Sequence, residues 1–266
     1  MATYKEGYTN YKIEKINETI KSHKISYVKK LSQFGWIMGY GFHPKNINNT
    51  IALKERIFQK ENKIIISPLK NPEKLTISKI IESLDMQFSY HYEDFGGSKL
   101  PVLAFYAIYQ IIINEVSRYN NCELKELGSH TASDRTSKSS GDIELFKNSA
   151  LFESIEIKLD KEIDANILRI AEEKIIRYNP QRYYVLSYFS TKESERNQIN
   201  EVIERVKENH GCQIVINGVL PTLKYYLRLV SDLNIFITLY SSLIQDDSEL
   251  KACHKEKWNE LILRLE

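Results

Sequence analysis

Residues 141–159 read GDIELFKNSALFESIEIKL and predict a β-hairpin. Residues 142–146 are the first predicted strand, residues 147–149 are the turn, and residues 151–159 are the second strand. Side chains alternate between the two faces of a strand. One face of the second strand is therefore predicted to carry Phe152, Ser154, Glu156 and Lys158. An acidic residue and a lysine two positions apart thus point the same way, close to the aspartate that begins the first strand.

Helices and strands around the hairpin predict a mixed α/β fold. Pro101 is well placed in the first turn of a helix, and apolar residues follow it at helical spacing up to Tyr119. Beyond the hairpin, helices and strands are predicted to alternate over residues 164–178, 182–188, 193–209 and 212–216, with helices from Pro221 onward. We expect three parts, namely an N-terminal region (1–97), a core (98–217) and a C-terminal helical region packed on the core (218–266).

The composition predicts a folded protein that stays in the cytoplasm. The 266 residues suffice for a large hydrophobic core. The N-terminus lacks the apolar segment of a signal peptide, and the longest apolar run, residues 101–116, is interrupted by Gln110 and Asn114. We therefore expect neither export nor a membrane segment. The three cysteines show no zinc-site spacing, which a reducing compartment permits, and they are Cys122, Cys212 and Cys253.

Asp142, Glu156 and Lys158 form a candidate site for phosphodiester hydrolysis. This reaction needs a cation that neutralises charge on the phosphate and lowers the pKa of the attacking water, and Mg²⁺ typically takes one or two carboxylates plus water and phosphate oxygens. Asp142 and Glu156 suit that role, with the backbone carbonyl of Ile157 as a third ligand. Lys158 is placed to orient the water or to stabilise negative charge. The alternative is an ion pair on an ordinary surface hairpin, since such pairs are common and contribute little.

The hairpin resembles the motif of the PD-(D/E)XK nucleases. Gly141-Asp142 is followed by Glu156-Ile157-Lys158, and the order of predicted elements matches the α-β-β-β-α-β core of that superfamily. Several segments are also similar to bacterial restriction endonucleases encoded beside cytosine DNA methyltransferases, and they are residues 98–110, 129–135, 141–144, 152–158 and 182–186. The resemblance covers roughly residues 98–187 and leaves out both ends of the chain.

The resemblance implies an enzyme that depends on Mg²⁺, with Mn²⁺ as a substitute. Carried over by position, it makes Asp142 and Glu156 the metal ligands and Lys158 the catalytic lysine. Gly141 stands where the motif has proline, a change that many members tolerate. Glu115, on the helix before the hairpin, lies where some members place a further acidic ligand, although an exposed helical glutamate explains this residue more simply.

A polar segment precedes the first predicted metal ligand. Residues 128–141 contain almost no apolar side chain and predict a solvent-facing loop, either a flexible linker or a DNA-binding element. The donors that we expect to bind DNA there are His130, Ser133, Arg135 and Lys138. Further candidates lie in residues 1–100, which carry 16 Lys and Arg against 10 Asp and Glu, although a solvated surface explains such an excess equally well. These candidates are Asn46, Asn48, Asn49, Lys54 and Arg56.

The resemblance implies a type II restriction endonuclease that cleaves double-stranded DNA at a specific short sequence. A homodimer is expected, because a palindromic site needs two active sites related by a two-fold axis. The resemblance implies a cognate DNA methyltransferase as functional partner. A structure-specific repair or recombination nuclease is the alternative within the same chemistry. A non-catalytic DNA-binding module with a nuclease-like fold is the alternative from a different class, and the intact Asp142, Glu156 and Lys158 argue against it.

Overall fold

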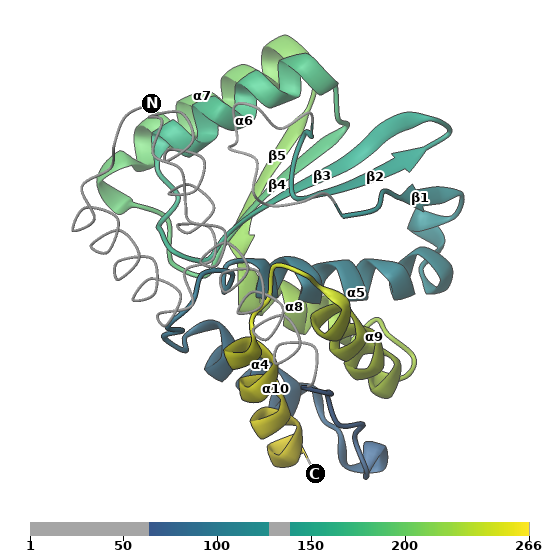
Figure 1. Ribbon diagram of the computed structural model, residues 1–266. Coiled ribbons are helices and arrows are strands. Elements are labelled where there is room, and N and C mark those ends of the chain that lie inside the picture. Colours follow the sequence, from purple (N-terminus) through teal and green to yellow (C-terminus); the bar gives the residue numbers. More distant parts are fainter. Residues whose placement is uncertain (1–63, 128–138, 266) are drawn as a thin grey trace, which may run out of the picture. The chain divides into compact units, whose positions relative to one another are not determined.

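A five-stranded mixed β-sheet forms the centre of the structure (Figure 1). The computed structural model describes residues 64–127 and 139–265. The chain divides into two compact units, Met1–Ile65 and Ile66–Glu266, and every element named below belongs to the second. The strand order is β1-β2-β3-β4-β5, and the strands are Cys122–Leu124, Ile143–Lys147, Ala150–Lys158, Arg182–Ser187 and Gln213–Gly218. Strands β1, β2 and β3 pair antiparallel, whereas β3, β4 and β5 pair parallel.

Two helices cover one face of the sheet, which we call the α6 face (Figure 1). Helix α6 spans Ala165–Tyr178, and α7 spans Arg196–His210 after a 3-10 turn, η3, at Glu193–Glu195. Asp164 begins α6 by accepting a hydrogen bond from a first-turn N–H at 2.8 Å, and Asn179 ends it in the left-handed conformation. Apolar side chains of both helices pack on β4 and β5, and they include Ile167, Leu168, Ala171, Ile175, Ile199, Val202 and Val206.

Helix α5 (Lys99–Glu115) crosses the opposite face, which we call the α5 face, together with α8 (Val219–Leu227). Every residue of α5 from Lys99 to Tyr109 is buried, because the helix lies between the sheet and further helices. Those outer helices are α4 (Ile77–Phe88), α9 (Leu233–Asp246) and α10 (Ala252–Leu265). Despite the apolar content of α5, no helix within the described ranges is long and apolar enough to cross a lipid bilayer.

The described elements confirm an α/β protein, with shifts at several predicted boundaries. Helix α5 begins two residues before Pro101 and ends at Glu115, and a 3-10 turn, η2 (Ser117–Tyr119), replaces its last predicted residues. Strand β1 was not predicted, because three residues are too short to show a periodic pattern. Helix α4, assigned above to the N-terminal region, packs against α8 and α10 within the same compact unit as the sheet.

The hairpin of β2 and β3 contains the predicted turn and an unpredicted bulge. Asn148 and Ser149 have φ angles of 51° and 62°, as a tight two-residue hairpin turn requires. Leu145 pairs with Glu153, and the next residue of β2 pairs with Leu151. Phe152 is therefore an extra residue on β3 and forms a β-bulge.

The bulge changes the face to which Phe152 belongs. Its ring packs edge-on against Tyr119, with 6.4 Å between ring centroids, and lies 5.2 Å from the guanidinium carbon of Arg118. Tyr119 belongs to the core on the α5 face, whereas Glu156 binds a lysine of α6. The prediction that Phe152 shares a face with Glu156 is therefore wrong, because the bulge interrupts the alternation of side chains.

Candidate active site

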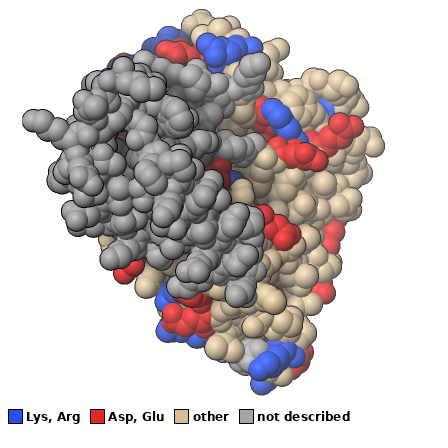
Figure 2. Space-filling model, in the orientation of Figure 1, with Lys and Arg blue, Asp and Glu red and all other residues tan. Residues whose placement is uncertain are grey.

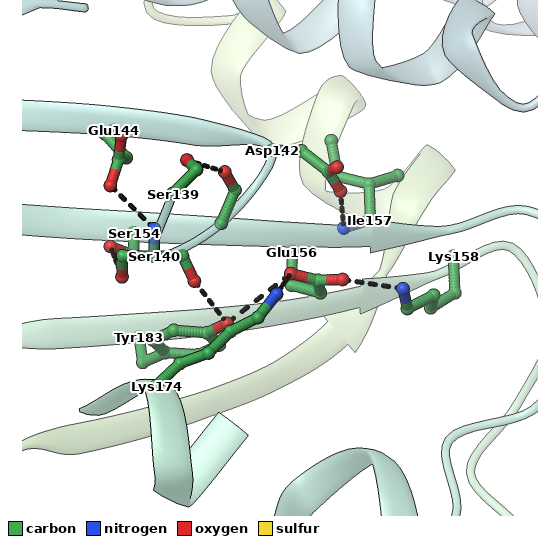
Figure 3. Close-up of polar contacts among 11 residues, drawn as sticks. Ser139, Ser140, Asp142, Glu144, Ser154, Glu156, Ile157, Lys158, Lys174 and Tyr183 are labelled. Carbon is green, nitrogen blue, oxygen red and sulfur yellow. Dashed lines mark hydrogen bonds and ion pairs between the residues drawn. The ribbon is translucent and has the colours of Figure 1, made fainter. Parts of the chain in front are cut away.

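Asp142 lies immediately before β2, and its carboxylate is held against β3. The N–H of Ile157 donates a hydrogen bond to Asp142 Oδ2 at 2.7 Å. Ile143 pairs with Ile155, so the register continued by one residue sets Asp142 opposite Glu156. The N–H and C=O of one residue in an extended strand point to the same edge, so the Ile157 carbonyl also faces Asp142. The predicted ligands from the two strands therefore lie close together (Figure 3).

Glu156 is buried, with 6 % of its surface exposed, and each of its carboxylate oxygens binds a lysine. Lys158 Nζ lies 2.6 Å from Oε1, and Lys174 Nζ lies 2.8 Å from Oε2. Lys158 follows on the same strand, whereas Lys174 reaches the carboxylate from α6, so that Glu156 lies between the two ammonium groups (Figure 3). The hydroxyl oxygen of Tyr183 on β4 lies 3.5 Å from Oε2. The cluster thus contains a second lysine beside the predicted one.

The two carboxylates have opposite pKa shifts. Burial and the negative charge of Glu156 raise the pKa of Asp142 to about 7, although the hydrogen bond from Ile157 opposes the change. Burial also disfavours the ionised form of Glu156, but the ammonium groups of Lys158 and Lys174 outweigh it and lower the pKa of Glu156. Asp142 and Glu156 are thus two buried carboxylates that repel each other. A cation bound between them would offset this repulsion.

A chain of hydrogen bonds holds the segment that leads into β2. Ser140 Oγ lies 2.5 Å from Ser154 Oγ, and the Ser140 N–H donates to Glu144 at 2.8 Å. The hydroxyl of Tyr183 donates to the Ser140 carbonyl at 2.8 Å, and the same hydroxyl contacts Glu156. Both serines are fully buried. Tyr183 therefore ties the backbone before the hairpin to the carboxylate of β3.

Gly141 lies so close to β3 that a side chain does not fit. A Cβ at this position would lie 2.7 Å from the carbonyl oxygen of Ile155 and 3.2 Å from its nitrogen. Both atoms belong to the backbone, so neither moves without a shift of the strand. The close approach explains why this position has glycine, since every other residue has a Cβ.

We expect Gly141→Ala to lower the free energy of unfolding by about 1–3 kcal/mol, because the added methyl group must push β3 away from its neighbour. Amide hydrogen exchange at Ile157 should also accelerate, since its hydrogen bond to Asp142 depends on that spacing. The matched control is Gly211→Ala at the end of α7. Gly211 has φ of 76° and open space around it, so its substitution strains the backbone without touching the hairpin. Unchanged stability and exchange in Gly141→Ala would contradict the close approach.

A hollow opens beside the carboxylates on the α6 face. It has a volume of about 70 Å³, is open to solvent, and lies between β3, β4 and α6. Its polar lining comprises Glu156, Lys158, Lys161, Asp164, Asn166, Lys174 and Tyr183. Lysine ammonium groups and a side-chain amide donate hydrogen bonds, and ammonium groups are common ligands of phosphate. The hollow therefore suits an anionic group next to the carboxylates.

The chemistry of the donors fits Mg²⁺. Asp142, Glu156 and the Ile157 carbonyl offer hard oxygen atoms, and Mg²⁺ takes few protein ligands and keeps several waters. Within residues 64–127 and 139–265, no three His, Cys, Asp or Glu side chains converge as a metal site. The candidate ligands at this site are thus two carboxylates and one backbone carbonyl. Both oxygens of Glu156 are bonded to lysines, so a cation has to compete for them.

Glu115 does not join this set. Ser231 donates to its carboxylate from both the hydroxyl, at 2.7 Å, and the backbone N–H, at 2.8 Å. These bonds tie the end of α5 to the segment before α9, which is an ordinary structural role. We therefore do not retain Glu115 as a metal ligand.

The two other glutamates of the hairpin are also engaged elsewhere. Glu144 binds Lys125, and Glu153 binds Arg118. Glu153 is fully buried on the α5 face, where the hydroxyl of Tyr119 also donates to it at 3.3 Å. Asp142 and Glu156 are thus the two acids of the hairpin that meet beside the hollow.

Four predicted residues lie outside the described residues, and a further one was missed. The loop donors His130, Ser133, Arg135 and Lys138 fall in residues 128–138, so their role stays a prediction. Lys174 was not predicted from the sequence. It follows Ile167 by seven positions and Ile170 by four, which puts it on the inward face of an amphipathic helix. A lysine at an inward position was the available sign of a functional side chain.

Charges on the visible face of the described residues are mixed. Figure 2 shows acidic and basic side chains beside one another over this face, without a continuous basic surface. The hollow likewise combines three lysines with two carboxylates, and these residues are Lys158, Lys161, Lys174, Glu156 and Asp164.

Comparisons with known proteins found no match that includes the residues of the candidate site. A family model of the Cache domain matches residues 1–48. This segment is less than a fifth of the chain and lies outside the described residues, so the match bears on neither the hairpin nor α6. A search of curated proteins found no match to the chain.

Proposed function

We propose that this chain is a Mg²⁺-dependent type II restriction endonuclease, which hydrolyses phosphodiester bonds in double-stranded DNA at a specific short sequence. The observation that carries the proposal is the placement of Asp142 opposite Glu156, with Lys158 bonded to the second carboxylate. The resemblance to PD-(D/E)XK nucleases implies this same set of residues, and the mixed sheet with α5 before the hairpin and α6 after it is compatible with that core.

Each residue of the set has a separate role in the proposed reaction. Asp142, Glu156 and the Ile157 carbonyl would hold the cation. When bound, the cation neutralises charge on the phosphate and lowers the pKa of the attacking water. Lys158, whose side chain is 15 % exposed at the hollow, would orient that water or donate to the phosphate as negative charge develops. Mn²⁺ accepts the same oxygen donors and is expected to substitute.

DNA recognition in this proposal is divided between two parts of the chain. The hairpin holds one phosphate and cannot also read several base pairs, so base contacts must come from other segments. We assign phosphate contacts to His130, Ser133, Arg135 and Lys138, and base readout or dimerisation to residues 1–97. A homodimer acting on a palindromic site follows from the same reasoning. The proposed setting is a bacterial cytoplasm, with a cognate DNA methyltransferase that protects the host sequence.

Two alternatives remain distinct from this proposal. A structure-specific nuclease would use the same residues and cleave branched DNA without preference for sequence. A non-catalytic DNA-binding module would have no need of two carboxylates and a lysine in one buried cluster. Keeping such charges together costs stability unless they act on a ligand, and this favours catalysis.

The choice of metal tests the proposal. Mg²⁺ and Mn²⁺ are expected to support cleavage of plasmid DNA, whereas Ca²⁺ should allow binding with little cleavage, because Ca²⁺ is larger and a weaker Lewis acid. Lys158→Met should reduce the cleavage rate by at least about a hundredfold. Lys207→Met, an exposed lysine of α7 paired with Glu204, is the matched control and should cleave at the wild-type rate. Undiminished cleavage in excess EDTA, or in Lys158→Met, would refute the assignment.

A further inference from the structure

We propose that Lys174 competes with the divalent cation for Glu156 and, once displaced, binds a DNA phosphate in the hollow on the α6 face. The inference rests on the proposed function and adds to it a residue that the resemblance does not supply. Lys174 would thus link metal binding to substrate binding.

The competition follows from the contacts of Glu156. Lys158 occupies Oε1 at 2.6 Å, and Lys174 occupies Oε2 at 2.8 Å. A hard cation bound by this carboxylate needs at least one of the two oxygens. Both lysines have a flexible four-carbon side chain, but Lys158 lies on the same strand as Glu156 and has its own role in the proposed reaction, whereas Lys174 reaches Oε2 from α6. Lys174 is therefore the lysine that this inference displaces when a cation binds.

The charge of the cluster changes when a cation binds. Glu156 is the one carboxylate of the described residues that forms an ion pair with Lys174. A divalent cation shared by Asp142 and Glu156 compensates the charge of both carboxylates. The ammonium group of Lys174, 11 % exposed, then loses its ion pair, and Asp164 is the other carboxylate that lines the hollow. An anion entering the hollow replaces that ion pair.

The surroundings of Lys174 keep it at the site after displacement. Helix α6 is anchored to the sheet by Leu168, Ala171 and Ile175, all of which are buried. The withdrawn side chain therefore stays in the hollow, which Lys161 and Asn166 also line. A DNA phosphate in the hollow would accept hydrogen bonds from donors of both β3 and α6. The adjacent phosphate of the same DNA strand would then lie at Asp142 and Glu156.

Metal affinity in the absence of DNA tests the competition. Mn²⁺ is titrated into the full-length protein by calorimetry, with Glu156→Gln identifying the binding that belongs to this site. Lys174→Met is expected to bind Mn²⁺ about tenfold more tightly than wild type, because one competing ion pair is removed. Lys161→Met, which removes a lysine from the same hollow without an ion pair to Glu156, is the matched control and should change the affinity less than about twofold.

DNA affinity tests the second half of the inference. With Ca²⁺ in place of Mg²⁺, Lys174→Met should bind DNA about tenfold more weakly, and the salt dependence of binding should fall by roughly one phosphate contact. Lys174→Arg keeps the charge and should restore DNA binding. If Lys174 had only a structural role, its substitution would not strengthen metal binding and weaken DNA binding at the same time. Opposite changes in the two affinities therefore distinguish the proposed role from a structural one. Lys174→Gln gives the same test if the methionine variant does not fold.

The outcomes separate this inference from the proposed function. If wild type binds Mn²⁺ at Glu156 and Lys174→Met binds it no more tightly, Lys174 does not compete and the inference falls alone. If DNA affinity is unchanged in Lys174→Met, its phosphate role is overturned. If neither wild type nor Lys174→Met binds Mn²⁺ in a manner sensitive to Glu156→Gln, the metal site itself is refuted, and the proposed function falls with the inference.

Discussion

Asp142→Asn is expected to reduce Mg²⁺-dependent DNA cleavage by at least about a thousandfold while making the metal-free protein more stable at alkaline pH. Asparagine has nearly the same shape, and its amide oxygen still accepts the hydrogen bond from Ile157. The variant therefore keeps the local structure and loses the negative charge that a cation requires.

The gain in stability depends on pH in a defined way. Burial and the charge of Glu156 raise the pKa of Asp142 from 3.8 to about 7, so the folded protein binds this proton more tightly than the unfolded chain does. The folded state of wild type therefore loses stability as the pH rises from about 4 to about 7, and the loss is complete above that range. Each pKa unit corresponds to about 1.4 kcal/mol, so a gain of a few kcal/mol is the upper bound for the variant.

Thermal unfolding at pH 5 and pH 8.5, in the absence of metal, measures this difference. Asp142→Asn should exceed wild type by more at pH 8.5 than at pH 5. Asp160→Asn, which removes an exposed carboxylate just after β3, is the matched control and should leave both stability and cleavage close to wild type. A lower melting temperature for Asp142→Asn at both pH values would mean that the carboxylate has a structural role.

Glu156→Gln should lose cleavage to a similar extent, but it should destabilise the protein. Glu156 forms ion pairs with Lys158 and Lys174, and its substitution leaves Asp142 as the remaining carboxylate near the two ammonium groups. Breaking a buried ion pair from one side costs about 3–5 kcal/mol. Chemical denaturation is therefore expected to show opposite changes for the two carboxylates, although both variants are inactive.

A double variant separates the two consequences. Glu156→Gln combined with Lys174→Met removes one uncompensated charge together with its partner and should recover much of the lost stability. Cleavage should remain absent, because the metal ligand is still missing. Recovery of cleavage in the double variant would show that Glu156 is not a ligand, and wild-type stability in Glu156→Gln alone would contradict the two ion pairs.

The parts of the fold predicted from sequence are those set by local patterns. Alternation of residues and the turn predicted at residues 147–149 place β2 and β3 to within one residue, and helical spacing from Asp164 to Tyr178, ended by Pro180, defines α6. Glu156 and Lys158 were predicted to lie on one face of β3, because the alternation of side chains along a strand follows from sequence spacing alone. The ion pair between their side chains agrees with this prediction.

The features missed from sequence depend on contacts between distant segments. The bulge at Phe152 arises from the pairing of two strands, which the sequence of one strand does not reveal. Lys174 meets Glu156 only because α6 packs on β4, the neighbour of β3, and Gly141 is constrained by the backbone of Ile155. The short strand β1 lacks enough residues for any period and depends on its pairing with β2.

Sequencing the ends of a DNA digest tests the central claim most directly. Phage genomic DNA is incubated with the full-length protein and Mg²⁺, and the fragment ends are sequenced beside reactions with EDTA and with Asp142→Asn. The claim predicts discrete fragments with 5′-phosphate and 3′-hydroxyl ends, a shared short sequence at every end, and no fragments in either control. Intact DNA after incubation of the folded wild-type protein with Mg²⁺ or Mn²⁺, or equal fragmentation by Asp142→Asn, would contradict it.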